Sequence, residues 1–406
     1  MKVLVLNSGS SSVKYQVIDT AAGDPLVVGL VERIGAGGAL LSQTRSVDGD
    51  RVRSSAPILD HRDAIRAILD LIADPEHGVV DRFDEIGAVG HRVVHGGERF
   101  VESVRIDDAV VEEIRESIAL APLHNPHNLA GILAARSRLP DVPQVAVFDT
   151  AFHAGMPPHA YHYAVPYVLY RRYRIRRYGF HGTSHQHVGQ RVAALLDRDP
   201  ADLRTISIHL GNGASACAID GGRSVDTSMG FTPLEGLVMG TRSGDLDAAV
   251  ILHVMGREEL GVADATSLLN KHSGLQGLSG ISSDMRDLLE EESEGSERAR
   301  LALDVYCYRV RKYIGAYAAA MGGVDAIGFT GGVGQNSAEI RARCLEGLTF
   351  LGVELDADAN AALSGGAEGF FHRGAVAVAA IRTGEELVIA LEAERLSDVD
   401  PASLPD

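Results

Sequence analysis

Short apolar runs recur along the chain between glycine-rich or polar turns, and they predict alternating strands and helices. Each run has the length of a strand and is bounded by turn residues. Between two of these runs, Ile65, Ile68, Leu69 and Ile72 have the spacing of a helix with one buried face, which residues 110–118 repeat more weakly. This alternation is typical of an α/β protein. The strands expected in the first part of the chain are residues 2–6, 13–18, 27–31, 86–94 and 142–148.

A second half of the chain begins near residue 150 and continues the same alternation. Its longest predicted helix covers residues 296–321, and a short helix is expected over residues 385–394. The position of that last helix, so close to the end of the chain, suggests that it crosses back to the first domain. The strands predicted in this half are residues 205–210, 214–219, 326–330 and 376–381.

A chain of 406 residues is long enough for two domains. We expect an N-terminal domain over residues 1–150, with the helix at about 385–397 packing back on it, and a C-terminal domain over residues 151–384. The boundary near residue 150 rests on the pattern alone, because no low-complexity linker separates the halves. The tail after Ser397 is expected to be frayed.

Two stretches share a strand–loop–strand design rich in small and hydroxyl residues, at residues 3–14 and 205–220. Such a loop turns backbone N–H groups and hydroxyls toward an approaching ligand, and phosphate oxygens suit them. Lys14 adds a positive charge beside the first loop. Two phosphate-binding hairpins predict a duplicated core that grips a nucleotide between its halves.

A third glycine-rich loop, residues 328–337, follows a strand and opens a predicted helix. We expect Asn336 to cap this helix, with Glu339 three residues further on. Glycines there allow the backbone to approach a flat or phosphorylated ligand closely. One such loop is also typical of an ordinary strand–helix turn, but three in one α/β chain favour nucleotide binding.

Three charged residues stand at strand ends or in tight turns. Arg242 lies between two glycines, and Arg92 comes at the end of an apolar strand. Most arginines are inert surface residues, yet these two are placed to hold a carboxylate or phosphate through two parallel N–H bonds. Asp149 ends a buried strand, the usual place for a catalytic group in an open α/β sheet. The alternative is that Asp149 or Thr150 simply caps the next element.

Two histidines, His181 and His185, come just before or within a predicted helix. They could bind a metal at i, i+4 if both lay on that helix. No third ligand has a suitable spacing, and His181 precedes the expected N-cap at Thr183 or Ser184. We therefore favour a hydrogen-bonding role for His181 over a zinc site.

The segment from Thr383 to Glu386 has the pattern of a capping box. Thr383 would be the N-cap, and the Glu386 side chain would reach back to its backbone. Glu385 then has no structural role and is available to hold a metal-bound water.

Composition limits the classes of function. The net charge of −17 argues against a nucleic-acid or anionic-membrane partner, since both need a basic face. The basic run at residues 171–177 is expected to be a solvated surface segment. The three cysteines make no disulfide framework and have no metal-type spacing. Neither a signal peptide nor a membrane span is apparent, so a soluble, cytoplasmic protein is expected.

Seven segments, taken together, resemble the acetate kinases of the acetokinase family along nearly the whole chain. The block from Thr227 to Asp245, which contains Arg242, is highly specific. Gln335 stands where the family usually has Glu, His127 where it has Pro, and Ala248 where Pro is common. The matching segments are residues 7–14 (Asn-Ser-Gly-Ser-Ser-Ser-Val-Lys), 91–98 (His-Arg-Val-Val-His-Gly-Gly-Glu), 121–126, 148–153, 177–185, 227–245 and 282–286.

The resemblance implies the fold shared by acetate and sugar kinases, Hsp70 and actin. This fold has two domains with related ribonuclease H-like cores and an active-site cleft between them. The resemblance also implies reversible, direct in-line phosphoryl transfer from ATP to acetate, giving acetyl phosphate and ADP. It further implies Mg²⁺, for which Mn²⁺ can substitute, and a homodimer formed mainly through the C-terminal domain.

Residue roles carried over by motif are likewise expectations. Arg92 would hold the acetate carboxylate, while Arg242, His181 and Asn212 would contact the transferring phosphoryl group. Asp149 would orient the reacting partners or the groups around them, and Asn7 and Glu385 would position Mg²⁺. A small apolar pocket for the acetate methyl would consist of Val94, Leu123, Phe180 and Pro233. The expected nucleotide-binding residues are Lys14, His209, Leu210, Gly211, Asn212, Gly213, Asp284, Met285, Arg286, Gly332, Val333, Gly334, Gln335 and Asn336.

Three other functions compete with this one. A kinase for propionate or butyrate would use the same machinery, but Val94 favours acetate because a smaller side chain would make room for another methylene. A non-catalytic nucleotide clamp would need neither Arg92 nor Arg242 in glycine-rich turns. The third competing function is that of an inactive relative of the kinases that serves only as a binding protein. Flux direction, metal and nucleotide preference and allosteric control do not follow from the sequence.

Overall fold

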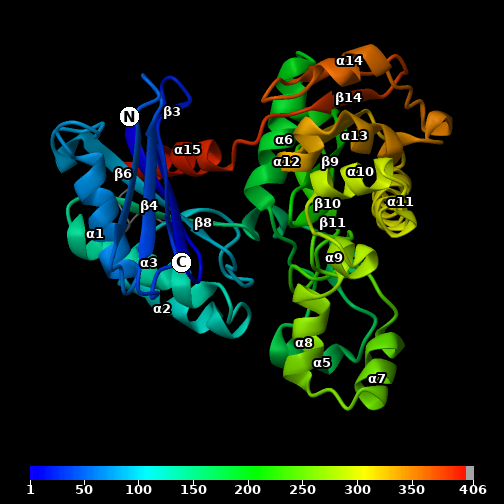
Figure 1. The fold of residues 1–406 in the computed structure, drawn as a ribbon, viewed down its shortest axis with the longest axis horizontal. Coiled ribbons are helices and arrows are strands. Elements are labelled where there is room, and N and C mark those ends of the chain that lie inside the picture. Colours follow the sequence, from blue (N-terminus) through cyan, green and yellow to red (C-terminus); the bar gives the residue numbers. More distant parts are fainter. Residues whose placement is uncertain (399–406) are drawn as a thin grey trace. The chain divides into compact units, whose positions relative to one another are not determined.

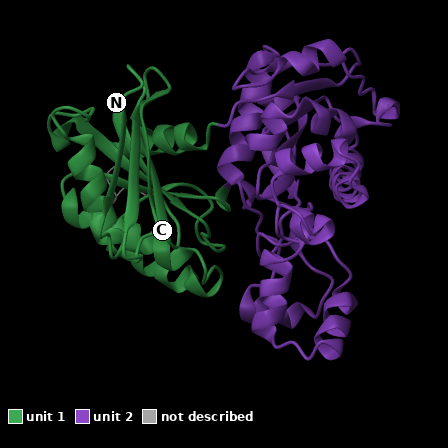
Figure 2. Cartoon of the chain, in the orientation of Figure 1, with its two compact units in different colours: residues 1–151, 384–406 green, residues 152–383 purple. Residues whose placement is uncertain are grey.

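The chain forms one unit, passes into a second and returns to the first near its end (Figure 2). Unit 1 holds residues 1–151 together with the chain from residue 384, and unit 2 holds residues 152–383. The computed structural model describes residues 1–398, so most of the tail expected to be frayed lies outside the described residues.

The apolar runs at the start of the chain build an eight-stranded mixed sheet in unit 1, with strand order β5-β4-β3-β2-β1-β6-β8-β7. Five consecutive strands form an antiparallel meander, whereas β1, β6 and β8 are parallel. All five strands predicted in this part are confirmed. The strands are β1 (Lys2–Ser8), β2 (Ser12–Asp19), β3 (Asp24–Glu32), β4 (Ala39–Arg45), β5 (Arg51–Ala56), β6 (Ile86–Val93), β7 (Val104–Arg105) and β8 (Gln144–Phe148).

Helices cover both faces of this sheet because its central strands, such as β1 and β6, have buried apolar side chains on both sides (Figure 1). Helices α1 (His61–Ile72) and α3 (Asn125–Arg138) pack on one face, where Ile65 and Ile68 are fully buried. Helix α15 (Glu385–Ser397) packs on the other face against β1, β6 and β8. Helix α2 (Asp108–Glu116) packs against α3.

Unit 2 contains a six-stranded sheet whose central part repeats the topology of unit 1. Its order is β11-β10-β9-β12-β14-β13, with an antiparallel β9–β10–β11 meander and parallel β9, β12 and β14. The duplicated core and the α/β class predicted from the sequence are therefore confirmed. The strands are β9 (Arg204–Leu210), β10 (Ala214–Asp220), β11 (Arg223–Thr227), β12 (Ala326–Thr330), β13 (Gly369–Phe370) and β14 (Ala377–Ala380).

Two long helices dominate unit 2. Helix α6 (Gly182–Leu195) buries Val188 and Val192 against β12 and β14, and α11 (Glu297–Ala320), predicted at residues 296–321, packs against β9 and β10. No helix in the described part of the chain is both long and apolar enough to cross a bilayer. The other helices are α4 (Pro158–Tyr161), α5 (Tyr167–Tyr173), α7 (Ala248–Arg257), α8 (Val262–Lys271), α9 (Gly274–Ser279), α10 (Met285–Ser293), α12 (Gly331–Asn336), α13 (Ala338–Leu345) and α14 (Ala357–Ala362).

Two predicted helix caps are wrong. Asn336 ends the short helix α12, and the next helix, α13, is capped by the Ser337 hydroxyl instead. Helix α15 begins at Glu385 after Gly384, one residue too late for a capping box built on Thr383. The Glu386 side chain does not reach back, because it lines a cavity in unit 1.

Candidate active site

Arg92 in unit 1 is held by a carboxylate at the end of the neighbouring strand. Its Nε donates to both oxygens of Asp149 at 2.9 and 3.1 Å, and its Nη2 donates to Oδ2 at 2.7 Å. Nη1 lies 3.6 Å from an oxygen of Glu385. Burial alone would lower the pKa of Arg92, but the charges of Asp149 and Glu385 outweigh it and raise that pKa, so the guanidinium stays charged.

This pairing corrects one expectation. Arg92 was expected to present two parallel N–H bonds to a substrate carboxylate, but the Nε–Nη2 edge already binds Asp149. The edge that carries Nη1 is the one available to a second anion. Asp149 therefore acts on Arg92, and it does not cap the next element.

Two buried amides fix the loop after β6, and sequence reasoning gave neither of them a role. The Asn125 side chain bonds the backbone N–H and carbonyl of His95 at 3.2 and 2.9 Å. Asn128 accepts from the Val94 N–H at 3.1 Å and donates to the Ser8 carbonyl at 2.8 Å. Asn128 thus ties the end of β1 to the end of β6 from helix α3, beside Arg92.

Two of the predicted site residues of unit 1, Asn7 and Lys14, share a cavity, whereas Glu385 is not among the residues that line it. Asn7 on β1 pairs directly with Lys14 on β2, so their side chains project from the same face of the sheet. Both line a cavity of about 390 Å³ together with Glu386. Burial and the neighbouring charge of Glu385 raise the pKa of Glu386.

The glycine-rich turn after β1 is held by a histidine. His61 Nε2 donates to the Gly9 carbonyl at 2.7 Å, and the His61 ring stacks on His127 with centroids 5.5 Å apart. His127, one of the departures from the family pattern, thus supports the residue that fixes this turn.

In unit 2, three predicted site residues converge on Gly213. A Cβ atom placed on Gly213 would lie 3.6 Å from His181 Nε2 and 3.7 Å from Arg242 Nη1. The Asn212 carbonyl accepts from the Gly240 N–H at 3.0 Å, which joins its loop to the turn that carries Arg242. Both nitrogens therefore lie close to the same point beside Gly213.

Neutral groups hold the Arg242 side chain. Nη1 donates to the Pro233 carbonyl at 3.1 Å and approaches Met239 Sδ at 3.7 Å. Burial lowers the pKa of Arg242, because these neutral acceptors do not offset the lost hydration. A buried guanidinium with neutral partners is prepared to receive an anion.

His181 precedes helix α6, but the expected N-cap was wrong. His181 itself is the N-cap, in a left-handed conformation with φ 58°, and α6 begins at Gly182. Both ring nitrogens of His185 bond to hydroxyls, those of Ser207 and Ser215, so His185 is not available as a ligand. No group of three or more histidine, cysteine, aspartate or glutamate side chains that could hold a metal ion occurs among residues 1–398.

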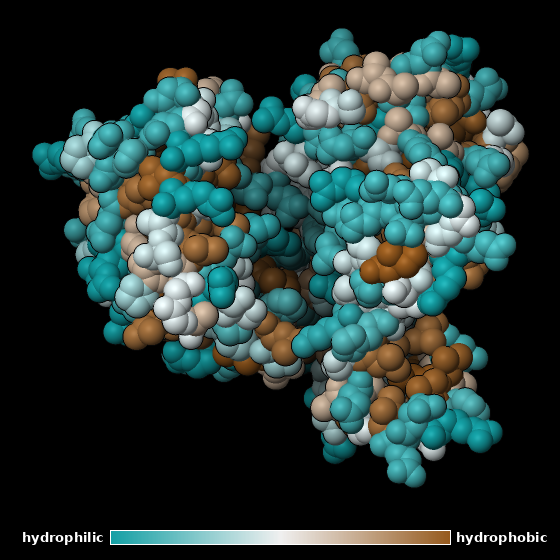
Figure 3. Space-filling model, viewed as in Figure 1, coloured by the Kyte–Doolittle hydropathy of each residue, from teal (hydrophilic) through white to brown (hydrophobic). Residues whose placement is uncertain are grey.

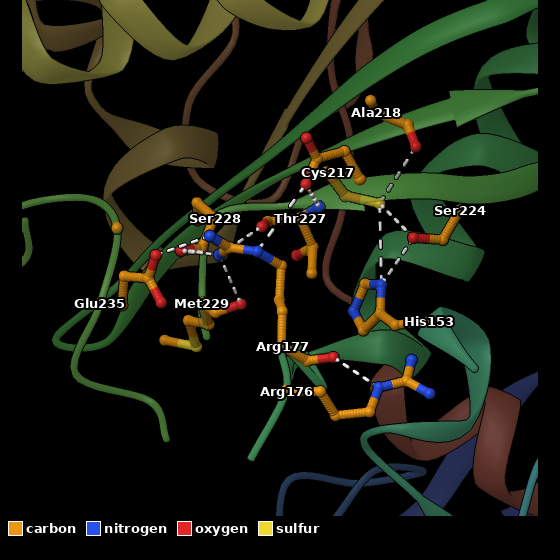
Figure 4. A network of polar contacts seen from close by, with 12 residues as sticks. His153, Arg176, Arg177, Cys217, Ala218, Ser224, Thr227, Ser228, Met229 and Glu235 are labelled. Carbon is orange, nitrogen blue, oxygen red and sulfur yellow. Dashed lines mark hydrogen bonds and ion pairs between the residues drawn. The ribbon is translucent and has the colours of Figure 1, made fainter. Parts of the chain in front are cut away.

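A buried arginine organises the segment that leads to Arg242 (Figure 4). Arg177 donates to the carbonyls of Thr227, Ser228 and Met229 at 2.9, 3.0 and 3.1 Å. Its Nη2 donates to Glu235 Oε1 at 2.6 Å. One guanidinium thus fixes a turn of irregular backbone whose carbonyls would otherwise lack partners.

The basic run at residues 171–177 was expected to be solvated, and for its last two residues this is wrong. Arg177 is mostly buried, and the Arg176 guanidinium lies 3.6 Å from the centroid of the Tyr161 ring. Arg171 and Arg172 are exposed as expected. The charge pattern of the sequence alone does not distinguish exposed arginines from mostly buried ones.

Two of the three predicted nucleotide-binding segments of unit 2 lie together. A Cβ on Gly331 would lie 2.4 Å from the Leu210 carbonyl, so the loop at 331–336 packs directly on the one at 209–213. The fully buried Arg341 donates to the carbonyls of Gly334 and Gln335 at 3.0 and 2.7 Å. This arginine fixes the position of the third glycine loop.

The remaining segment, residues 284–286, starts α10. Its side-chain hydrogen bonds are internal: Asp284 caps the helix and binds Arg286 at 2.7 Å. These contacts lower the pKa of Asp284 to about 2. Nothing in the described residues joins this segment to the other two.

The apolar residues predicted for the acetate methyl divide between the units. Val94 and Leu123 belong to unit 1, and Phe180 and Pro233 to unit 2. Phe180 is buried and Val94 and Pro233 are partly buried, whereas Leu123 is 67% exposed. The pocket therefore stays a prediction.

Comparison with known proteins gives consistent matches over nearly the whole chain. A family model described as the Acetokinase family matches residues 2–391. A Desulfitobacterium hafniense protein named acetate kinase is 53% identical over 392 residues, 97% of this chain and 98% of that protein. The structure of Porphyromonas gingivalis acetate kinase has a TM-score of 0.94 at 45% identity, covering 97% and 99% of the two chains. A propionate kinase from Francisella tularensis has a TM-score of 0.90 at 39% identity, with the same coverage.

Proposed function

Since the chain belongs to the acetokinase family, we propose that it transfers the γ-phosphoryl group of ATP to acetate, giving acetyl phosphate and ADP. The observation that carries this proposal is the convergence of His181 Nε2 and Arg242 Nη1 on the space above Gly213. Two donors directed at one point suit a group whose negative charge spreads over several oxygens during transfer. The neighbouring glycine loops of unit 2 suit the rest of the nucleotide.

Acetate needs positioning more than activation. Its carboxylate is already an anion at neutral pH, so transfer requires no general base. The difficulty is to bring two negative groups together, and Arg92 reduces it by neutralising the carboxylate through its Nη1 edge. Asp149 keeps that edge in place by occupying the other one.

A divalent cation fits the carboxylates of unit 1. The three carboxylates of Asp149, Glu385 and Glu386 outnumber the two cations, Arg92 and Lys14, that lie near them. Carboxylate and amide oxygens suit Mg²⁺, which takes few protein ligands and completes its shell with water and phosphates. Asn7 and Glu385 would hold Mg²⁺ through water, and the ion would neutralise phosphate charge. Mn²⁺ would serve as a substitute.

Replacing Glu385 with glutamine tests the metal site. The Mg²⁺ concentration for half-maximal turnover is expected to rise about 10–100-fold, because the side chain keeps its shape but loses its charge. Glu392→Gln on the same helix, which removes an ion pair with Arg395, should leave the Mg²⁺ requirement unchanged. An unaltered requirement in Glu385→Gln would remove this residue from the metal site.

The proposed reaction is tested by trapping the product with hydroxylamine. Purified protein, Mg-ATP and acetate, propionate or butyrate should give acyl hydroxamate, with the highest kcat/KM for acetate. Val94→Ala is expected to shift selectivity toward propionate by about 10-fold or more, since one methylene is worth roughly 1–3 kcal/mol. Absence of product with every acid would favour a nucleotide clamp or another acceptor.

Propionate is the second candidate acceptor. The exposure of Leu123 leaves one expected wall of the methyl pocket without support within unit 1, and a propionate kinase is among the similar structures. A higher kcat/KM for propionate would keep the mechanism and overturn the argument from Val94.

We also propose a cytoplasmic homodimer formed through unit 2. Apolar side chains gather over α5, α7 and α8 in Figure 3, where Tyr167, Leu252 and Val262 are 60, 69 and 77% exposed. Such exposure on one lobe suits a surface covered by a second copy of the chain. Light scattering should give twice the chain mass, and Leu252→Asp should reduce it to a monomer. A monomeric parent protein would contradict the proposal.

A further inference from the structure

A continuous line of hydrogen bonds leads from the interior of unit 2 to His181. Ser207 Oγ and His185 Nδ1 lie 2.8 Å apart, and His185 Nε2 and Ser215 Oγ also 2.8 Å. Ser215 Oγ lies 2.8 Å from His181 Nδ1. The first three of these residues are fully buried, so water does not compete for their bonds.

The sheet explains why these side chains meet. Ser207 and His209 are two residues apart on β9, and Ser215 pairs with His209 on β10. All three therefore project from the same face of the sheet. Helix α6 packs against β9 and carries His185 into their midst.

Proton counting leaves this line with two possible directions. Burial holds the pKa of His185 well below its usual value, so its ring is neutral and has one N–H. The Ser215 hydroxyl has one proton to donate. If the Ser215 hydroxyl uses its proton within this line, either Ser207 donates to His185, His185 to Ser215 and Ser215 to His181, or every bond runs the other way.

The surroundings of His181 favour the first direction. His181 Nε2 and Arg242 Nη1 lie 3.6 and 3.7 Å from the same point above Gly213, where the transferring phosphoryl group is proposed to lie, and an anion there favours an N–H on Nε2 over a lone pair. In a neutral ring only one nitrogen donates. If Ser215 donates to Nδ1, the proton of His181 lies on Nε2, directed at that point.

We propose that Ser215 and His185 are positioning residues that hold His181 in the tautomer with its proton on Nε2. The hydrogen bond from Nε2 to the transferring phosphoryl group is then prepared before substrates bind. Preorganised donors of this kind stabilise charge that develops in the transition state. The inference rests on the proposed role of His181 in phosphoryl transfer.

A second serine–histidine pair in unit 2 provides a matched control (Figure 4). His153 Nε2 lies 3.0 Å from the Phe180 carbonyl, which can only accept, so Nε2 carries the proton. Ser224 Oγ lies 2.7 Å from His153 Nδ1 and donates to it. Because the carbonyl alone fixes this tautomer, removing the Ser224 hydroxyl should not change it.

The tautomer is measured directly by NMR of the full-length protein labelled with ¹⁵N-histidine. Two-bond and three-bond correlations between the ring nitrogens and the protons bound to ring carbons distinguish the two neutral tautomers from each other and from the doubly protonated ring. The signals of His181 are assigned by their loss in His181→Asn. We expect a protonated Nε2 and an unprotonated Nδ1 for both His181 and His185 in the parent protein. A proton on Nδ1 of His181, with or without one on Nε2, would overturn the proposal without any variant having to fold.

Kinetics provides the second arm. Ser215→Ala should move the His181 proton toward Nδ1 and lower kcat about 10–100-fold, with KM for ATP and acetate within about 3-fold. Ser224→Ala should change neither the His181 spectrum nor kcat by more than about 2-fold. In Ser215→Ala, an altered His181 tautomer with normal kcat, or a lowered kcat with an unaltered tautomer, would contradict the proposal that the tautomer of His181 determines kcat. His181→Ala separates the proposed role of His181 in transfer from the proposed positioning role of Ser215 and His185. Normal turnover in His181→Ala would remove His181 from the mechanism itself.

Discussion

Arg242→Ala is expected to lower kcat by about 10³–10⁵-fold, the loss found when an arginine that stabilises a transferring phosphoryl group is removed. KM for ATP should change little. The partly buried guanidinium contacts neutral acceptors and forms no ion pair with a carboxylate of residues 1–398, so its charge is available to the phosphoryl oxygens. Since its contribution is greatest in the transition state, its loss appears in kcat rather than in ground-state binding.

Two further variants make this result specific. Arg242→Lys keeps a positive charge but loses the planar fork, so most of the loss should persist. Arg373→Ala removes an exposed arginine that pairs with Asp356 and should leave kcat unchanged. Steady-state kinetics gives kcat and the KM for ATP, and calorimetric titration with ADP measures nucleotide binding directly. Near-normal turnover in Arg242→Ala would exclude this residue from the mechanism.

The second large effect concerns Arg92 and the carboxylate that holds it. Arg92→Ala is expected to lower kcat/KM for acetate about 10²–10⁴-fold, because the carboxylate loses its counter-charge and its orientation. Asp149→Asn keeps the shape of the side chain but removes its charge, and it should cost about 10²-fold through misplacement of the guanidinium.

A double-mutant cycle distinguishes positioning from direct action. If Asp149 acts only through Arg92, adding Asp149→Asn to Arg92→Ala should lower kcat/KM by less than about 3-fold more. Multiplicative losses would show instead that Asp149 contacts the reacting groups itself. The cycle needs only initial rates at varied acetate concentration.

The fold could be predicted to the extent that apolar runs mark its strands. Strands β1, β2 and β9 are buried apolar runs, and sequence alone identified them. Strand β5 was missed because its residues are mostly exposed and polar, and only pairing with β4 makes it a strand. The caps of α13 and α15 were wrong because helix ends depend on backbone geometry within a residue or two.

The candidate site likewise contains residues that the sequence predicts and residues that it does not. Charged residues at strand ends and in glycine turns, such as Arg92 and Arg242, follow from local pattern and family motifs. The side chains that fix the neighbouring backbone could not be found in this way, because Asn128 and Arg177 bind backbone atoms far away in the chain. Asn128 stands just after a matched segment, and Arg177 opens one, but a motif does not reveal which carbonyl its side chain binds.

The departures from the family pattern can now be placed. His127 stacks on His61 beside the first phosphate loop. Gln335 is buried, and its backbone carbonyl accepts a hydrogen bond from the Arg341 guanidinium. Both positions support loops expected to bind phosphate or nucleotide, and neither replaces a residue proposed to act in transfer.

Direct transfer without a phosphorylated enzyme makes a specific prediction for the stereochemistry of the phosphoryl group. ATP made chiral at the γ-phosphorus with oxygen isotopes would be turned over with acetate, and the configuration of the acetyl phosphate determined. One in-line displacement between Arg92-bound acetate and ATP predicts inversion. Retention would require an even number of transfers, and with it a phosphorylated residue that this account does not contain.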